Sequence, residues 1–285
     1  MSHELRHRDD LPTSLRSVLA QRGFVWSSCC DKSQVIDAQI YSSKSHDRWL
    51  ESLANSTTRK LLRKLVAETR GATRPQLAAI CAEPMLSQRL SLFEEVGILR
   101  QEDDIVYLTR NVDSFGHTLE WYVAYLVSRS LNAEAAWGAK IEDVYGGGDF
   151  DVLAWLDSMG ALLYIECKSK APDDVTENEI RNFLQRSQEL APESAIFLVD
   201  TDSPVADLVN RFNDILTAVQ VAKLKPQPRF PGIYYGCGRV YLTGSMPSLL
   251  TQIQKCLRHY TTSVKGAAMI WGEPRDYIRG QILES

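Results

Sequence analysis

Two apolar segments in the middle of the chain, residues 150–156 and 161–168, flank a short polar turn. Apolar runs of this length around a turn are typical of two antiparallel β-strands, so the sequence predicts a β-hairpin here. The turn also sets which residues face each other across the two strands. With its tip at residues 158 and 159, Asp151 is expected directly opposite Glu166.

The segments before this hairpin show helical periods and one pair of short strands. Residues 98–100 and 105–109 predict a small β-hairpin around a polar turn. No function is assigned to residues 1–46. Apolar residues at helical spacing predict a helix over 11–22, a helical region from Asp47 that is interrupted near 55–58, a helix capped by Thr73, a helix over 83–96 and another from Ser114.

Beyond Ser114 the predicted order is one helix, three strands, one helix and one strand. This order, with a mixed sheet, makes an α/β protein the predicted fold class. The first strand is expected over 137–145, the central hairpin supplies the next two, a helix follows over 176–190, and a buried strand over 195–200 closes the set. A helix over 205–221, a hairpin from 233–235 and 240–243, and a helix over 247–260 are expected to extend it.

The two opposed acids carry the predicted chemistry. Like charges directly opposite in an antiparallel pair are destabilising unless something neutralises them, and the simplest neutraliser is a divalent cation. Strand alternation places Lys168 on the same face as Glu166, while Ile165 and Cys167 point into a core. Two carboxylates, with the remaining ligands from water and phosphate, suit Mg²⁺, and a neighbouring ammonium can stabilise a phosphoryl transition state or poise a water. The predicted chemistry is metal-assisted phosphodiester hydrolysis.

These residues resemble the motif of the PD-(D/E)XK nuclease superfamily, the restriction-endonuclease-like fold, with Asp151 followed by Glu166-Cys167-Lys168. The resemblance covers about residues 114–200, and the predicted αβββαβ order is the core order of that fold. It implies that Asp151 and Glu166 bind Mg²⁺, or Mn²⁺ in its place, and that Lys168 is the catalytic lysine. The chain departs from the motif in having Phe150 where the motif has proline. The alternative is an ordinary hairpin with a surface Asp–Lys pair.

The same resemblance implies accessory residues on the two neighbouring helices. Glu120 matches, by position, an acidic residue that the preceding helix often brings to the metal; alternatively, it only favours the helix dipole. Gln185 matches a glutamine near the site of some relatives, and Arg181 and Arg186 are expected to meet backbone phosphates, although exposed helix polarity explains all three. The glycines at 146–148 lack the spacing of a phosphate-binding loop, which excludes that kind of nucleotide site. They are expected to give the backbone freedom beside the metal.

Residues 48–112 resemble a winged-helix domain in their order of helix, helix-turn-helix and hairpin. The expected wing is acidic over 102–104, which does not suit insertion into DNA. Binding of a protein partner, or self-association into a homodimer, is therefore the competing use of this domain. A basic run and the recognition helix supply the predicted nucleic-acid contacts: Arg59, Lys60, Arg63, Lys64, Gln88 and Arg89. For the basic run, a solvated amphipathic helix is the alternative.

Composition narrows the class of protein. The chain has 285 residues, of which 44% are hydrophobic and 24% charged, as in an ordinary soluble protein with one large or two modest domains. A net charge of −4 argues against a generic polyanion binder. No apolar run approaches about eighteen residues and the N-terminus lacks a signal-peptide core, so we expect a cytoplasmic protein without a membrane partner. The six cysteines form no C-x-x-C pair, which indicates reduced thiols.

Four segments are predicted: an unassigned one over 1–47, a winged-helix-like domain over 48–112, a nuclease-like domain over 113–260 and a tail over 261–285. The predicted function is a metal-dependent nuclease, with DNA as the favoured substrate in a defence, restriction or repair role. Two alternatives stay open. One is a non-catalytic DNA-binding regulator or assembly factor with a nuclease-like scaffold, and the other is an RNA nuclease.

Overall fold

The computed structural model describes residues 11–28, 32–37, 43–142, 144 and 149–265, and the chain falls into two compact units. Unit 1 joins the segment before residue 30 to the segment that starts at Val123. Unit 2 is the segment between them, Cys30–Tyr122. Unit 1 is therefore discontinuous in sequence, and unit 2 is inserted into it.

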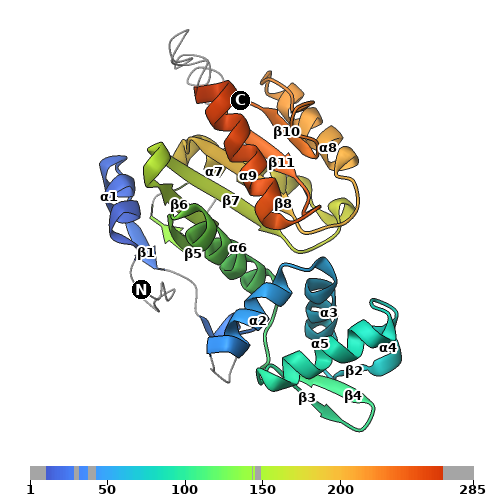
Figure 1. Ribbon diagram of the computed structural model, residues 1–285. Helices are drawn as coiled ribbons and strands as arrows, with labels where there is room; N and C mark the ends of the chain where they lie inside the picture. Colours follow the sequence, from blue (N-terminus) through green and yellow to red (C-terminus); the bar gives the residue numbers. More distant parts are fainter. Residues whose placement is uncertain (1–10, 29–31, 38–42, 143, 145–148, 266–285) are drawn as a thin grey trace. The chain divides into compact units, whose positions relative to one another are not determined.

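Unit 1 is built on a mixed β-sheet whose described residues form eight strands in the order β1-β5-β6-β7-β8-β11-β10-β9 (Figure 1). β7, β8 and β11 are parallel, and the other neighbours pair antiparallel. The connection from β7 to β8 passes through a helix, as a crossover between parallel strands requires. The strands are β1 Trp26–Ser28, β5 Glu134–Ile141, β6 Phe150–Leu156, β7 Ala161–Lys168, β8 Ser194–Val199, β9 Lys225–Pro226, β10 Ile233–Gly236 and β11 Val240–Thr243.

Three helices share a core with one face of this sheet. Within this core Phe183 contacts Phe197 of β8, with ring centroids 5.2 Å apart, and Phe212 at 6.3 Å. Edge-to-face aromatic packing of this kind adds about 0.5–1.5 kcal/mol per pair to the burial of apolar area. The three helices are α1 Thr13–Gln21, α7 Glu177–Leu190 and α8 Ala206–Ala218.

The opposite face is covered by α9, Leu249–His259 (Figure 1). His259 Nδ1 lies 2.9 Å from the hydroxyl of Tyr241 on β11. The strand neighbours of Tyr241, Val240 and Leu242, belong to the first core, and alternate residues of a strand point to opposite faces. The sheet is therefore sandwiched between helical layers.

The predicted αβββαβ order is confirmed. α6, Gly116–Leu131, is followed by β5, β6, β7, α7 and β8, so the chain is an α/β protein as expected. β5 begins at Glu134, before the predicted position 137, because Ala135 and Ala136 pair with β6 despite the low strand propensity of alanine.

The register of the β6–β7 hairpin also agrees with the prediction. Val152 pairs with Ile165 and Leu156 with Ala161, so the next position along the ladder brings Asp151 opposite Glu166. The turn has 3₁₀ geometry over Asp157–Met159. Gly160 follows at φ +56°, a left-handed conformation that glycine adopts without a steric cost.

α1 gives the N-terminal segment a structural role that the sequence left unassigned. At its N-terminus the Glu134 carboxylate accepts hydrogen bonds from the backbone N–H groups of Ser14 at 2.7 Å and Leu15 at 3.2 Å. After its C-terminus Arg22 pairs with Glu193 at 2.8 Å. Its apolar side is buried through Leu11, Leu15 and Leu19. The helix is thus held at both ends by carboxylates from distant parts of the chain.

Unit 2 contains the predicted helices and hairpin. Asn55 caps α3, and Thr73 forms the capping box of α4 with Gln76. A third strand, β2, was not predicted, because two residues are too short to show a pattern. The described elements of unit 2 before α6 are the 3₁₀ turn η1 Lys32–Gln34, α2 Ser43–Leu53, α3 Ser56–Ala67, β2 Ala72–Thr73, α4 Arg74–Ala78, α5 Glu83–Glu95, β3 Leu99–Glu102 and β4 Ile105–Leu108.

Some predictions fall on residues outside the described ranges. These are the glycines at 146–148, the Cys29-Cys30 pair and the tail from 266 onward. The four described cysteines, Cys81, Cys167, Cys237 and Cys256, are thiols without a disulfide, as predicted. Among the described helices, none is both long and apolar enough to cross a bilayer.

Candidate active site

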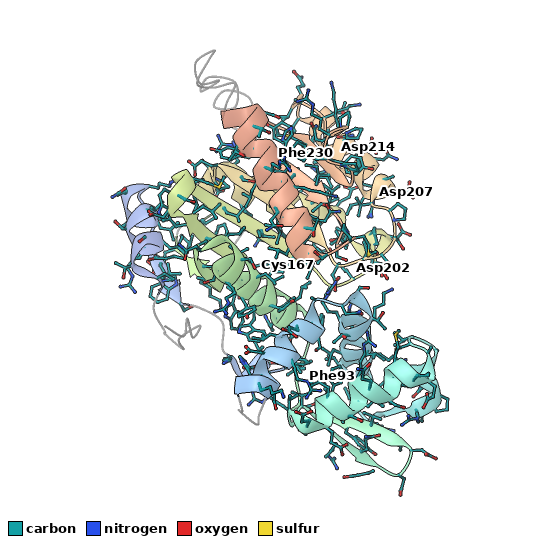
Figure 2. The ribbon with its side chains drawn as sticks, viewed as in Figure 1. Phe93, Cys167, Asp202, Asp207, Asp214 and Phe230 are labelled. Atoms are coloured by element: carbon teal, nitrogen blue, oxygen red, sulfur yellow. The ribbon has the colours of Figure 1, made fainter. Side chains whose placement is uncertain are left out.

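The candidate site lies where β6 begins and β7 ends. Asp151 is half-buried, and its Oδ2 accepts a hydrogen bond from the backbone N–H of Cys167 at 2.7 Å. Lys168 Nζ donates to Glu166 Oε1 at 2.7 Å. Cys167, labelled in Figure 2, marks this end of β7. Adjacent strands therefore bring Asp151, Glu166 and Lys168 together, in the arrangement expected from the register.

Glu166 is the most enclosed residue of this group, with 2% of its surface exposed. Its Oε1 accepts the hydrogen bond from Lys168. Its Oε2 accepts a hydrogen bond from the hydroxyl of Tyr164, and Arg186 Nη1 lies 3.6 Å from the same oxygen. A buried carboxylate is costly unless it is paired and hydrogen-bonded, and here three side chains meet that requirement.

Lys168 is held as an ammonium ion. Burial alone would lower its pKa, but the carboxylates of Glu166, Asp151 and Glu179 raise the pKa above its ordinary value. Glu179 Oε1 lies 3.6 Å from Lys168 Nζ, and its Oε2 accepts a hydrogen bond from Lys170 at 2.7 Å. A lysine with a raised pKa cannot take a proton from water at neutral pH. An ammonium placed in this way is suited to stabilise negative charge.

Tyr164 was not in the predicted site, and Arg186, which was expected to meet a backbone phosphate, lies beside Glu166. Burial raises the pKa of Tyr164, and Glu166 raises it further, so the phenol keeps its proton and remains a donor. Arg186 reaches the site from α7, where it is 8% exposed. Its Nη1 donates to the carbonyl oxygen of Asp149 at 2.5 Å, and its guanidinium lies 6.0 Å from the centre of the Phe150 ring.

The charges near Glu166 balance without a further ion. Among the described residues, the carboxylates of Asp151 and Glu166 are met by the cations Lys168 and Arg186. The opposed acids are therefore partly neutralised by the chain itself, and the divalent cation stays a prediction. Two side chains of the chain itself already supply the positive charge.

The carboxylate oxygens of this site are nevertheless ligands of the type that Mg²⁺ binds. Mg²⁺ is commonly held by one or two carboxylates, with waters and substrate phosphates completing its shell. Asp151 and Glu166 offer two carboxylates from facing strands, and each carboxylate oxygen has more than one lone pair. The described residues contain no group of three or more His, Cys, Asp or Glu side chains placed to hold a metal. Water and substrate would have to supply the remaining ligands.

The other predicted residues of α7 do not take part in this network. Gln185 Nε2 lies 3.5 Å from Glu189 Oε1, and Arg181 lies 3.4 Å from Glu177 with half of its side chain exposed. Successive residues of a helix point about 100° apart. Arg186 therefore lies on the face of α7 that meets the sheet and approaches Glu166. Its neighbour Gln185 lies on another face, near Glu189 one turn later.

Glu120 lies on the part of α6 that belongs to unit 2. Its Oε2 is 3.5 Å from Nδ1 of His117, one turn earlier in the helix, and 9% of the residue is exposed. The pair gives His117 a local role within the helix. The metal role of Glu120 stays a prediction.

Arg59 was predicted to contact nucleic acid, and the structure contradicts this prediction. It is only 1% exposed, and its Nη1 donates to the carbonyl oxygens of Leu53 at 2.6 Å and Ala54 at 2.9 Å. These carbonyls end α2, where backbone acceptors lack partners within the helix. Arg59 therefore joins α2 to α3 and does not present its charge to a phosphate.

Two more residues that were predicted to contact nucleic acid interact with side chains of unit 2 itself. Arg89 Nε donates to Thr58 Oγ1 at 3.1 Å, and the Arg63 guanidinium lies 5.8 Å from the centre of the Phe115 ring. Lys64 is one third exposed and pairs with Glu68 at 2.6 Å. Lys60 is partly exposed on the same helix face, and Gln88 is exposed on α5. The outward positive charge of α3 thus comes mainly from its lysines.

No protein-family model matches the sequence, and no curated protein matches it. Solved structures that are similar in arrangement include the following two. Protein VC1899 from Vibrio cholerae has a TM-score of 0.49 and 18% identity, covering 89% of this chain and 62% of that one. Can2 from Sulfobacillus thermosulfidooxidans, solved with cyclic tetra-adenylate, has a TM-score of 0.49 and 14% identity, covering 90% and 63%. This chain spans less than two thirds of either protein, and neither likeness bears on its activity.

Proposed function

We propose that this protein is a metal-dependent nuclease that hydrolyses phosphodiester bonds, with DNA as the preferred substrate. The supporting observation is the meeting of Asp151, Glu166 and Lys168 at one end of the β6–β7 hairpin. Two hard oxygen donors beside a fixed ammonium are suited to a phosphate that gains charge in its transition state.

Each residue has a defined task in this proposal. Asp151 and Glu166 would hold Mg²⁺, which supplies a Lewis acid and an activated water when bound. Lys168 stays protonated and places its positive charge beside the reacting phosphate. Tyr164 donates to Glu166 Oε2 and so fixes the orientation of that carboxylate. The proton of the attacking water must pass to a group other than Lys168.

The test is a cleavage assay on the purified protein with Mg²⁺, Mn²⁺ or EDTA. Linear, supercoiled, branched and single-stranded DNA are offered beside single- and double-stranded RNA, because the three residues act on a phosphodiester and do not identify the sugar. We expect cleavage of DNA with metal and none with EDTA. Cleavage of RNA alone would move the assignment to an RNA nuclease.

Substitutions then connect the activity to the site. Asp151→Ala should abolish cleavage, because it removes a metal ligand. Lys168→Ala should lower the cleavage rate by about 10²–10³-fold, the usual loss when a group that stabilises transition-state charge is removed. Lys225→Ala is the matched control, because Lys225 is exposed on β9 at the far edge of the sheet. Parental activity in both site variants would refute the metal-site assignment.

One observation favours a second candidate function. Both oxygens of Glu166 already accept hydrogen bonds, and its charge is met by Lys168 and Arg186. Such a closed network is also what a non-catalytic scaffold would keep, with unit 2 as the binding module. That alternative predicts nucleic-acid or protein binding with no cleavage under any metal, and binding unchanged by Lys168→Ala.

A further inference from the structure

The guanidinium of Arg186 meets Glu166 in a different way from the other two donors. Lys168 and Tyr164 each donate a hydrogen bond to the carboxylate. Arg186 Nη1 instead donates to the carbonyl oxygen of Asp149 and lies 3.6 Å from Glu166 Oε2, too far for a hydrogen bond. Arg186 therefore contributes charge to the site without occupying a lone pair of the carboxylate.

The guanidinium of Arg186 is held in position beside the site. Arg186 is 8% exposed, its anchor is a backbone carbonyl, and its guanidinium packs beside the ring of Phe150. A cation bound between Asp151 and Glu166 would have this positive charge as a close neighbour. In a partly buried site such repulsion is weakly screened, so it acts directly on the affinity for the cation.

We propose that Arg186 is the resident counter-charge of the candidate metal site and sets a low affinity for divalent cations in the absence of substrate. The proposal rests on the nuclease function proposed above. With Asp151, Glu166, Lys168 and Arg186 near charge balance, a divalent cation alone would leave the site with net positive charge. The phosphates of a bound nucleic acid would supply the missing negative charge, so cation and substrate bind cooperatively.

The test measures Mn²⁺ binding to the 285-residue chain without nucleic acid, by titration calorimetry and by the paramagnetic resonance signal of unbound Mn²⁺. Arg186→Gln removes the charge and keeps a polar N–H group on a shorter side chain. We expect it to bind Mn²⁺ about tenfold more tightly than the parent, within the usual range of coupling between two sites. Arg186→Lys keeps the charge and should bind Mn²⁺ like the parent.

Arg181→Gln is the matched control, because Arg181 lies on the same helix with half of its side chain exposed and pairs with Glu177. Its Mn²⁺ affinity should equal that of the parent. Equal or weaker Mn²⁺ binding by Arg186→Gln would overturn the proposal, and so would tighter binding by Arg186→Lys to the same degree. Thermal melting of every variant is recorded alongside.

Folding of the uncharged variant is itself informative. If Mn²⁺ can take the place of the lost charge, then Mn²⁺ should raise the melting temperature of Arg186→Gln more than that of the parent, since a ligand stabilises the state it binds. A variant that stays unfolded at millimolar Mn²⁺ would count against the proposal. Failure of the nuclease function has a different signature: no metal-dependent cleavage, and no Mn²⁺ binding that Asp151→Ala removes.

Discussion

At the scale of single residues, the site is defined by how completely Glu166 is surrounded. Three side chains from β7 and α7 approach its two oxygens, so the orientation of the carboxylate is fixed by the protein alone. A preorganised carboxylate avoids the cost of ordering when a ligand arrives. The same enclosure makes each of the surrounding donors important for stability, because a buried charge that loses a partner is costly.

Tyr164→Phe isolates one of these donors. The substitution keeps the ring and removes the hydroxyl that donates to Glu166 Oε2. We expect the free energy of unfolding to fall by about 1–3 kcal/mol, the usual cost of leaving a buried polar group without its partner. Chemical denaturation measures the change. Tyr107→Phe, on the half-buried strand β4, is the control and should stay within about 0.5 kcal/mol of the parent.

Glu179 predicts a dependence of stability on pH. Burial alone would raise its pKa, but hydrogen bonds from Lys170 and from the Thr176 backbone hold the pKa at about 2, below its ordinary value of 4.5. A lowered pKa means that the ionised form stabilises the fold. This contribution is complete above pH 4.5 and is lost as the pH falls toward 2.

Glu179→Gln should therefore be less stable than the parent at pH 7, and the gap should close as the pH falls from 4.5 toward 2. Denaturation at a series of pH values tests this. Glu177→Gln, in the same helical turn but with 68% of the Glu177 side chain exposed, should show a much smaller gap. A gap for Glu179→Gln that is constant down to pH 3 would contradict the prediction.

Single residues on helices were the hardest to place from sequence. Gln185 and Arg186 are adjacent, and so are Arg59 and Lys60, yet in each pair one side chain is buried and the other is at least partly exposed. Sequence shows that a helix carries polar residues but does not fix its rotation about its axis to within one residue. Long side chains add to this difficulty, because arginine can bury its stem and still find polar partners.

At the scale of elements, local signals were the most reliable. The β6–β7 register follows from the short turn that joins the two strands, since a tight turn leaves little freedom in pairing. The capping box at Thr73 and the cap at Thr176 likewise depend only on residues three positions apart. β2 escaped prediction because its two residues are defined by their partners in β4 and not by their own pattern.

The prediction at the scale of elements concerns the binding of DNA by α3. Its outward lysines, Lys60 and Lys64, lie one turn apart, whereas Arg59 is buried. If α3 meets duplex DNA, Lys60→Gln with Lys64→Gln should weaken binding similarly for all sequences. The salt dependence of log affinity should also flatten by about 0.9 per lost phosphate contact. Fluorescence anisotropy at several salt concentrations measures both effects.

Arg59→Gln provides the contrast. It should lower the stability of unit 2, because the carbonyls of Leu53 and Ala54 lose their donor, and it should leave the salt slope as in the parent. Unchanged affinity in the double lysine variant, together with loss of self-association, would assign this helix face to oligomerisation.

At the scale of the whole molecule, sheet order and the place of α1 could not be read from the sequence. The pairing of β11 with β8 and the packing of α1 both join segments far apart in the chain. No local pattern records such partners. The three buried leucines of α1 nevertheless make a clear prediction about the integrity of unit 1.

Removal of residues 1–28 should prevent stable folding of unit 1. Each buried leucine contributes about 2–5 kcal/mol, and the loss of three is comparable to the net stability of about 5–15 kcal/mol of a whole domain. Limited proteolysis should then degrade the segment from Val123 onward. Leu15→Ala, a partial loss at one position, should lower the melting temperature without unfolding the unit.

The discontinuity of unit 1 has a consequence for the order of events during synthesis. Trp26 of β1 pairs with Ile141, and Arg22 meets Glu193, 171 residues later. The N-terminal helix therefore leaves the ribosome long before its partners are made. Unit 2 is complete by Tyr122 and has its own core, so it can fold first. Until β5 to β8 emerge, the leucines of α1 lack the sheet that buries them in the folded unit.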